Sequence, residues 1–225
     1  MVHEEPCRYV VVAVAALLLV LGCDCGAQER AQDHSCTVHA AGALALPEGK
    51  DGNNFEKGWG FQAGGGFAIS RPAEPDRGNS WYITGNFMYQ KFRATSAALA
   101  EAKAANPTQL ANATSAHGGF SAVTLDPTIR HAFGRRYDVY GVGGVGWLRR
   151  GVGFNGANPG TLLHSNGFTL DRLASNSGVF DLGGGVNFSP NALGGFMLFA
   201  EARVYRGLAI NSGSTLVPLS LGIRW

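Results

Sequence analysis

Three histidines in the second half of the chain invite a catalytic interpretation. His117 lies near Ser115 in one predicted loop, His164 lies near Asp171 in another, and His131 falls between them. Histidine, an acid and a serine can together hydrolyse an ester, because the imidazole removes the proton of the attacking hydroxyl. Nothing in the sequence fixes these side chains relative to one another, and polar residues are common in loops. We therefore predict no catalytic activity and keep an enzyme as the alternative.

Two further motifs suggest a cofactor or a metal, but the residues around each motif lack what such a site requires. The segment Gly141–Gly146 matches the dinucleotide-binding pattern GxGxxG. However, a strand pattern continues directly after it, and no acidic residue follows at about 20 positions to close a βαβ unit. The pair Cys23 and Cys25 lacks the second pair or the histidine cluster that a zinc site needs. We predict neither a cofactor nor a metal ion.

A group of charged residues falls on one side of alternating segments. Its members are Asp126, Arg130, Asp181, Glu201, Arg203 and Arg224. Acidic and basic side chains enclosed together are expected to pair, because an unpaired buried charge is costly. Glu201, Arg203 and Arg224 lie on neighbouring segments and are expected within reach of one another. We predict a polar network that fills and stabilises an interior, with a proton- or ion-conducting path as the alternative.

These charged side chains need strands to position them, and the chain beyond residue 35 alternates with the period of two that is typical of strands. Eight segments show the pattern: residues 36–46, 58–70, 81–92, 119–133, 137–149, 179–189, 196–206 and 215–225. Each has about the 9 to 11 residues, or slightly more, of a tilted membrane strand. The segment 137–149 is interpreted as apolar on both faces. Pro127 cannot donate a backbone hydrogen bond, so we expect a bulge or a rim position there.

The last segment has the clearest alternation. One face carries Thr215, Val217, Leu219, Leu221, Ile223 and Trp225, and the other carries Leu216, Pro218, Ser220, Gly222 and Arg224. A soluble domain seldom ends in its most apolar strand, because free termini fray. A membrane barrel instead needs an ordered last strand that closes against the first. The predicted fold is therefore all-β: an eight-stranded antiparallel up-and-down transmembrane barrel.

The connecting segments agree with a barrel. If the first strand runs outward, the outer connections are residues 47–57, 93–118, 150–178 and 207–214, and the inner ones are 71–80, 134–136 and 190–195. Two of the outer connections are long and all of the inner ones are comparatively short, as in outer-membrane barrels. We therefore predict that both termini lie in the periplasm. A short helix is expected in the second outer connection, around Leu99, Ala102 and Lys103.

The apolar run at residues 9–22 predicts a secretory signal peptide, since a membrane-spanning helix needs about 20 residues. Cleavage is expected after Ala27. This divides the chain into a signal peptide (1–27), a short N-terminal segment (28–35) and the barrel (36–225). The alternative is lipoprotein processing, because residues 20–23 approximate a lipobox that ends in Cys23. Cys36 alone would remain after cleavage, so no internal disulfide is expected.

The composition fits this fold and excludes one class of partner. The chain has 33 glycines, 15% charged residues, a net charge of +2 and a mean hydropathy of +0.01. Membrane barrels have intermediate hydropathy because lipid-facing and lumen-facing residues average out along each strand. The arginines are scattered, so the sequence shows no cluster of basic residues of the kind that binds nucleic acid. The expected partner is outer-membrane lipid.

Aromatic residues near the ends of the predicted strands form another group. They are Trp59, Trp81, Tyr89, Tyr137, Trp147 and Trp225. Amphipathic rings favour the boundary between membrane and water, which predicts interfacial girdles. Binding of sugars or peptides by these rings is the alternative.

Several stretches of the chain resemble the small eight-stranded outer-membrane β-barrel family, which includes the OmpA transmembrane domain and OmpX-like proteins. They are the aromatic-glycine alternation of Gly58–Ile69, the stretches Thr124–Arg130 and Phe199–Tyr205, and the ending Pro218–Trp225. The resemblance covers residues 36–225. It implies that Leu219, Leu221, Ile223 and Trp225 form the signal read by the barrel-assembly machinery. It implies little about activity, because this fold hosts adhesins, anchors and acyltransferases.

Taken together, the sequence predicts a monomeric barrel in the outer membrane of a Gram-negative-type cell. Its lumen is expected to be filled by side chains, because an eight-stranded interior is just wide enough to hold them. The long outer loops favour a structural or surface-interaction role. The alternatives are a membrane-embedded lipid-modifying enzyme, a narrow channel, and a soluble β-barrel that binds a ligand.

Overall fold

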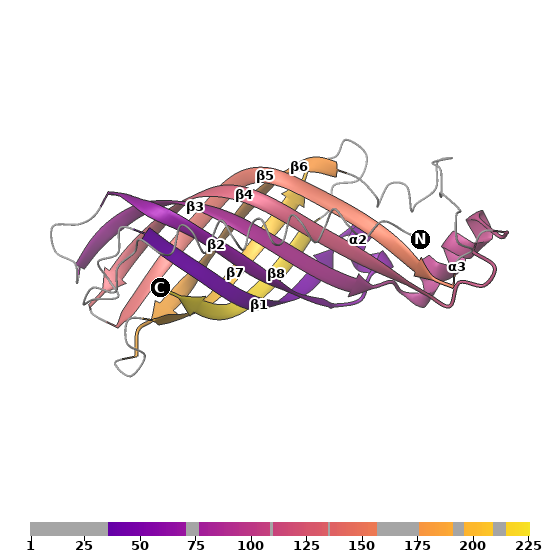
Figure 1. Ribbon diagram of the computed structural model, residues 1–225, viewed down its shortest axis with the longest axis horizontal. Helices are drawn as coiled ribbons and strands as arrows, with labels where there is room; N and C mark the ends of the chain where they lie inside the picture. The colour runs from indigo at the N-terminus through magenta and orange to yellow at the C-terminus, as the bar shows by residue number, and fades with distance from the viewer. Residues whose placement is uncertain are drawn as a thin grey trace.

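A single closed barrel accounts for the strands of the computed structural model. The structure describes residues 36–70, 77–108, 110–134, 136–156, 176–190, 196–208 and 215–225. In these ranges eight antiparallel strands pair in sequence order, and the last pairs with the first (Figure 1). The predicted all-β barrel is thereby confirmed. The signal peptide, the Cys23 lipobox, and His164 with Asp171 lie outside the described residues.

The strands are β1 (Cys36–Glu48), β2 (Gly58–Ser70), β3 (Arg77–Arg93), β4 (Ser115–Phe133), β5 (Tyr137–Asn155), β6 (Asn176–Phe188), β7 (Met197–Gly207) and β8 (Thr215–Arg224). Helix α2 (Lys50–Asn54) joins β1 to β2, and helix α3 (Ser96–Ala105) joins β3 to β4. Both helices lie at one end of the barrel, here called the helix end, and Trp225 marks the opposite, Trp225 end (Figure 1). No helix among the described residues has the length and apolar character that crossing a membrane would require.

The alternation of side chains determines whether each residue faces the lumen or the outside of the barrel. Along β7, burial alternates at every position from Met197 to Gly207, because successive side chains of a strand point to opposite faces. The outward positions expose large apolar side chains, for example Leu221 at 71% and Val145 at 66% exposure. The inward positions hold polar and charged side chains such as Glu201, which is buried. The phase of the alternation in β8 is the one predicted.

The ring closes through β8. This strand pairs with β1 from His39 opposite Arg224 to Glu48 opposite Thr215. Beyond that ladder, the Val38 N–H donates to the Trp225 carbonyl at 2.7 Å, and the Trp225 N–H donates to the Val38 carbonyl at 2.9 Å. Closure leaves no strand edge exposed, which is the condition for placing a sheet in lipid.

Strands β4 and β5 are longer than predicted. β4 begins at Ser115 and β5 ends at Asn155, where Ser115 pairs with Asn155 and His117 pairs with Gly153. The prediction that Ser115 and His117 lie in a loop is therefore wrong. It relied on apolar alternation, whereas the ladder continues wherever neighbouring strands satisfy the backbone groups. The strands project at the helix end together with α3 (Figure 1).

The predicted helix in the second connection is confirmed by α3. Thr95 caps its N-terminus, because the Thr95 Oγ1 accepts a hydrogen bond from the Ala98 N–H at 3.2 Å. Of the residues on which the prediction rested, Ala102 is buried and packs with Leu110 and Ala113. The connection therefore carries a small apolar core of its own at the helix end.

Pro127 is accommodated without the expected bulge. It faces outward in β4 and lies opposite Ile83 of β3. On the other side, pairing with β5 stops at Leu125 opposite Val145 and resumes in the same register at Thr128 opposite Val142. The missing N–H donor is thus absorbed by a short interruption of one ladder.

Candidate functional site

Arg203 of β7 lies at the centre of the charged side chains inside the barrel. Its Nη1 contacts Asp126 Oδ2 at 2.7 Å and Asp181 Oδ2 at 3.0 Å. Its Nε donates to Glu201 Oε1 at 2.6 Å, and its Nη2 donates to Glu201 Oε2 at 3.0 Å. The four side chains are at most 3% exposed. One guanidinium can join carboxylates from three strands because its planar fork carries five donors.

Neutral donors from further strands add hydrogen bonds to two of these carboxylates. Gln62 Nε2 of β2 donates to Glu201 Oε1 at 2.9 Å, and the Tyr140 hydroxyl of β5 donates to Glu201 Oε2 at 2.9 Å. Asn86 of β3 donates through its Nδ2 to Asp126 Oδ2. Hydrogen bonds to ionised groups are stronger than neutral ones, so this network crosslinks the wall from the inside. We call these seven residues the central network.

A second cluster lies nearer the Trp225 end. Arg130 Nη2 of β4 forms an ion pair with Asp138 Oδ2 of β5 at 2.6 Å. Asn187 of β6 donates through its Nδ2 to Asp138 Oδ1 and accepts from Arg224 Nη1 at 3.1 Å. Four strands are linked in this way, because β4, β5, β6 and β8 each contribute one residue.

Arg224 lies close enough to Glu201 to interact with it electrostatically, but its direct contacts are with other residues. Besides Asn187, its guanidinium carbon lies 4.5 Å from the ring centroid of Tyr140 and 4.9 Å from that of Phe199. Cation–π contacts of this kind stabilise a desolvated arginine. The structure therefore places Glu201 and Arg203 in direct contact, and it places Arg224 in the second cluster.

Several of these residues were not predicted from the sequence. The interpretation of 137–149 as apolar on both faces is wrong, because Asp138 and Tyr140 are buried and point into the lumen. Their even positions, opposite in phase to Val139 and Val145, could have revealed them. The polar partners Gln62, Asn86 and Asn187 could not be assigned from sequence, because single strands do not show which side chains meet across a lumen.

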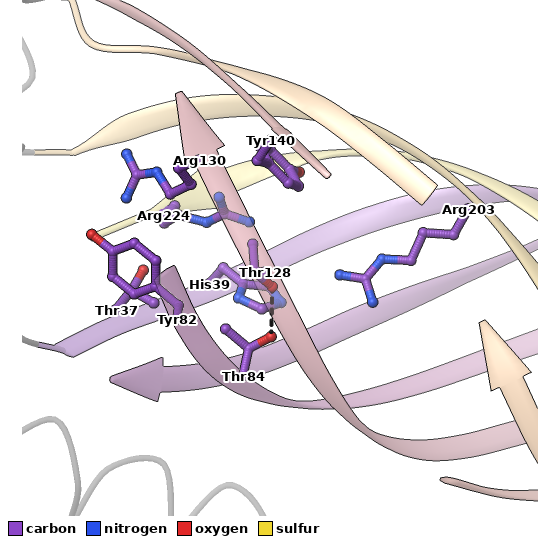
Figure 2. A pocket seen from close by; sticks show the side chains of 9 residues that line it. All are labelled: Thr37, His39, Tyr82, Thr84, Thr128, Arg130, Tyr140, Arg203 and Arg224. Atoms are coloured by element: carbon purple, nitrogen blue, oxygen red, sulfur yellow. Dashed lines mark hydrogen bonds between the residues drawn. The ribbon is translucent and has the colours of Figure 1, made fainter. Parts of the chain in front are cut away.

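A small cavity lies among these side chains. Its volume is about 10 Å³, and it is lined by Thr37, His39, Tyr82, Thr84, Thr128, Arg130, Tyr140, Arg203 and Arg224 (Figure 2). Figure 2 shows the hydroxyls of Thr84 and Thr128 joined across two strands, at 3.3 Å. Such a volume is close to that of one water molecule and is too small for an organic ligand.

An apolar cluster fills the lumen on the side of the helix end. It consists of Ala45, Phe55, Met88, Phe92, Phe120, Ala122, Leu148, Val179, Tyr205 and Leu216. The rings of Phe92 and Phe120 lie edge to face with centroids 5.1 Å apart, and Phe55 contacts Phe120 in the same way at 6.3 Å. We call this cluster the apolar plug. The lumen is therefore filled at two levels along its axis, by the charged central network and by the apolar plug.

The glycine-rich run of β5 makes room for the central network. A Cβ at Gly144 would lie 2.1 Å from Asp126 Oδ1, and a Cβ at Gly146 would lie 1.9 Å from the Val123 carbonyl oxygen. The run continues as strand on both sides. The run is therefore not followed by the helix that the dinucleotide-binding pattern GxGxxG requires.

Gly185 provides a test of this packing. A Cβ there would lie 2.6 Å from the Tyr140 hydroxyl and 2.4 Å from the Ala200 carbonyl oxygen. We expect Gly185→Ala to lower the free energy of unfolding by about 1–3 kcal/mol, because an overpacked interior must shift. Urea unfolding of the refolded barrel in detergent measures this. Gly42→Ala is the control, because no heavy atom lies within 4 Å of its Cβ. Equal losses in both variants would contradict the expectation.

Among the described residues considered for catalysis, the two histidines lie far apart. His117 and His131 lie at opposite ends of β4, roughly 45 Å apart at about 3.3 Å per strand residue. His131 Nδ1 contacts Asn79 Oδ1 at 2.7 Å, and Ser115 Oγ accepts from Asn155 Nδ2 at 2.9 Å. Among the described residues, no three His, Cys, Asp or Glu side chains are grouped to hold a metal ion.

The remaining predicted site residues lie on the outside of the barrel. Trp59, Trp81, Tyr137, Trp147 and Trp225 are exposed, and Tyr89 is half-buried. Leu219, Leu221 and Ile223 are exposed on the outward face of β8. Their roles in interfacial girdles and in assembly stay predictions.

No protein-family model matches the sequence, and no curated protein matches it significantly. Solved structures do match. Neisserial surface protein A is 16% identical with a TM-score of 0.52, over 84% of this chain and 96% of that chain. Ail of Yersinia pestis, in complex with the heparin analogue sucrose octasulfate, is 11% identical with a TM-score of 0.47, over 84% and 97%. The N-terminal β-barrel domain of Pseudomonas aeruginosa OprF is 13% identical with a TM-score of 0.41, over 84% and 97%.

The likeness to Neisserial surface protein A covers most of both chains. At this level of identity the comparison concerns the fold. The chain therefore has the fold of the small eight-stranded outer-membrane β-barrels, the family that its sequence resembles.

Proposed function

We propose that this protein is an outer-membrane barrel with a closed lumen and a structural or surface-interaction role. In this proposal the ends of β4 and β5 that project at the helix end lie at the cell surface. The observation that carries the proposal is the inverted distribution of polarity. Ion pairs lie in the interior, while Leu182, Val145 and Leu221 are each at least 66% exposed on the outside. Exposed apolar surface of this extent marks contact with a partner or with lipid. Only lipid would cover such a face around a complete ring.

The proposed orientation places the helix end outside the cell and the Trp225 end in the periplasm. It is supported by the lengths of the connections, because α2 and α3 both lie in connections at the helix end. Connections at the Trp225 end include the short link from Phe133 to Tyr137. Both termini are then periplasmic. We further propose export by a signal peptide cleaved after Ala27 and insertion as a monomer by the barrel-assembly machinery.

Fractionation and gel mobility test the membrane placement. The protein, expressed in a Gram-negative host, is expected in the outer-membrane fraction and in the detergent phase. Unheated samples are expected to migrate faster on a denaturing gel than boiled ones, because the closed barrel resists the detergent. Recovery of the folded protein in the soluble fraction would contradict the proposal and favour a soluble ligand-binding barrel.

Conductance measurements test whether the lumen is closed. We expect no ion channel from the parent protein in planar bilayers, because the apolar plug and the central network both block the path. The double variant Phe92→Ala, Phe120→Ala removes the centre of the plug and is also expected to be silent, because Arg203 and its carboxylates still fill the barrel. Steady unitary currents from the parent would contradict this and favour the narrow channel.

A further inference from the structure

A basic surface lies on the outside of the barrel near the helix end. Lys91 and Arg93 of β3 and Arg149 of β5 are exposed on outward positions. His117 and Ser121 of β4 lie between them and are half-buried. Together with Gly119 and Gly151, which form its floor, we call this surface the basic cradle.

The register of the strands brings the three cations together. Lys91 lies opposite Gly119, which lies opposite Gly151, and Arg149 is two positions from Gly151 on the same strand. Neighbouring strands are about 4.8 Å apart and strand residues about 3.3 Å apart, so the Cα atoms of Lys91 and Arg149 are separated by roughly 12 Å. Arg93 lies opposite His117 beside them. Long basic side chains can converge on one anionic group across such a span.

The floor of the basic cradle is open. A Cβ at Gly119 or at Gly151 would find no heavy atom within 4 Å. A Cβ at Gly153 would lie 2.5 Å from His117 Nε2, so that glycine lets the imidazole lie against the strand. The two glycines therefore leave the backbone between the cations uncovered by side chains.

In the described parts of β3, β4 and β5, all outward positions from Asn79 onward lack Asp and Glu. Lys91 and Arg149 therefore have no partner of opposite charge on these three strands. Arg93 lies beside one exposed acidic residue, Glu56, whose N–H donates to the Arg93 carbonyl at 2.9 Å.

Aromatic and then aliphatic side chains adjoin the cations in the direction of the Trp225 end. Tyr89 precedes Lys91 by two positions, and Trp147 precedes Arg149 by two positions. Farther along the same wall, Val123 is 53% and Val145 is 66% exposed. This order of groups matches the order of groups along a phospholipid. The cations correspond to the phosphate, the aromatic rings to the membrane interface, and the aliphatic side chains to the acyl chains.

We propose that the basic cradle binds the phosphate of a lipid headgroup in the leaflet at the helix end. The acyl chains then lie along Val123 and Val145. This inference rests on the proposed membrane placement and adds a preferred lipid class to it. Lipid contact alone would require apolar surface, whereas three cations around an open glycine floor select for negative charge.

Fluorescence quenching by brominated lipids measures the preference at the site. Trp147 is kept as the single tryptophan, with Trp59, Trp81 and Trp225 replaced by Phe. The barrel is reconstituted in phosphatidylcholine vesicles that contain brominated phosphatidic acid or brominated phosphatidylcholine. We expect stronger quenching by the phosphatidic acid, and a loss of preference of about fivefold for each cation removed by Lys91→Gln or Arg149→Gln.

Matched controls separate the basic cradle from general charge. Arg206→Gln removes an exposed outward cation of β7 that lies outside the cradle and is expected to leave the preference unchanged. Gly151→Leu fills the floor and is expected to reduce the preference, whereas Gly42→Leu, at another open glycine, is not. A barrel with Trp225 as its single tryptophan reports from the opposite end and is expected to show no preference for phosphatidic acid.

The outcomes are distinguishable. Equal quenching of Trp147 by the two lipids, or an equal effect of Arg206→Gln and Arg149→Gln, would overturn the basic cradle as a phosphate site. Absence of quenching by either lipid would instead overturn the membrane placement on which the inference rests. Loss of the preference with Gly151→Leu, at unchanged gel mobility of the folded barrel, would support the site without removing any charge.

Discussion

Replacing Arg203 with Met is expected to lower the free energy of unfolding of the barrel by about 3–5 kcal/mol. The change removes the one cation that contacts Asp126, Asp181 and Glu201, whose side chains are at most 1% exposed. Three buried carboxylates would then repel one another without a counter-charge. The expected loss is large compared with the total stability of a folded protein, which is about 5–15 kcal/mol.

Urea titration with the heat-dependent gel shift as readout measures this loss. A rescue variant provides the control: Arg203→Met combined with Asp126→Asn, Asp181→Asn and Glu201→Gln carries no buried charge at these positions and is expected to recover most of the stability. Glu201→Ala alone is expected to be destabilising as well, since it leaves Gln62, Tyr140 and Arg203 without their shared acceptor. An unfolding midpoint of Arg203→Met equal to that of the parent would contradict the central network as a stabilising element.

Removal of residues 215–225 is expected to abolish the folded barrel altogether. β8 supplies the ladder to β1 and the ladder to β7, so its loss leaves two open edges. Each unsatisfied backbone group in lipid costs several kcal/mol, and an open sheet therefore does not persist in a membrane. The shortened protein is expected to show no heat-dependent gel shift after refolding in detergent. A faster-migrating unheated form would contradict the role of β8 in closure.

Trp225→Ala separates closure from recognition during assembly. The backbone hydrogen bonds between Val38 and residue 225 are kept, so the stability of the refolded barrel is expected to change by no more than about 1 kcal/mol. In cells, the amount of folded protein in the outer membrane is expected to fall strongly if Trp225 belongs to the proposed assembly signal. Phe196→Ala is the matched control, because its ring contacts Trp225 at 5.8 Å and is outward but lies outside that signal. Equal losses in cells for the two variants would contradict the recognition role.

The eight strands could be predicted because each has an alternation of its own. In β7 and β8 the pleat alone assigns every side chain to the inside or the outside, and no knowledge of neighbouring strands is needed. The ends of β4 and β5 could not be placed in the same way. Ser115, His117 and Asn155 have no apolar pattern, and they are strand because partners on adjacent strands satisfy their backbone groups.

The candidate site was only partly predictable for the same reason. That Glu201 and Arg203 face inward follows from their positions in one strand. That Gln62 and Tyr140 reach the same carboxylate follows from the stagger of strands around a closed ring, which brings together residues distant in sequence. Asp138 was overlooked because the glycines and valines around it dominate the composition of β5.

The sequence by itself determined the fold class and the two faces of the wall, because a period of two is a local property of the chain. Only the tertiary structure decided that Arg224 stacks on Tyr140 and Phe199 while Arg203 holds three carboxylates. The same is true of the basic cradle, where Lys91 and Arg149 come from strands that are not neighbours in the sheet. Closing the barrel fixes these distances, because the ring sets the register of every strand against all the others.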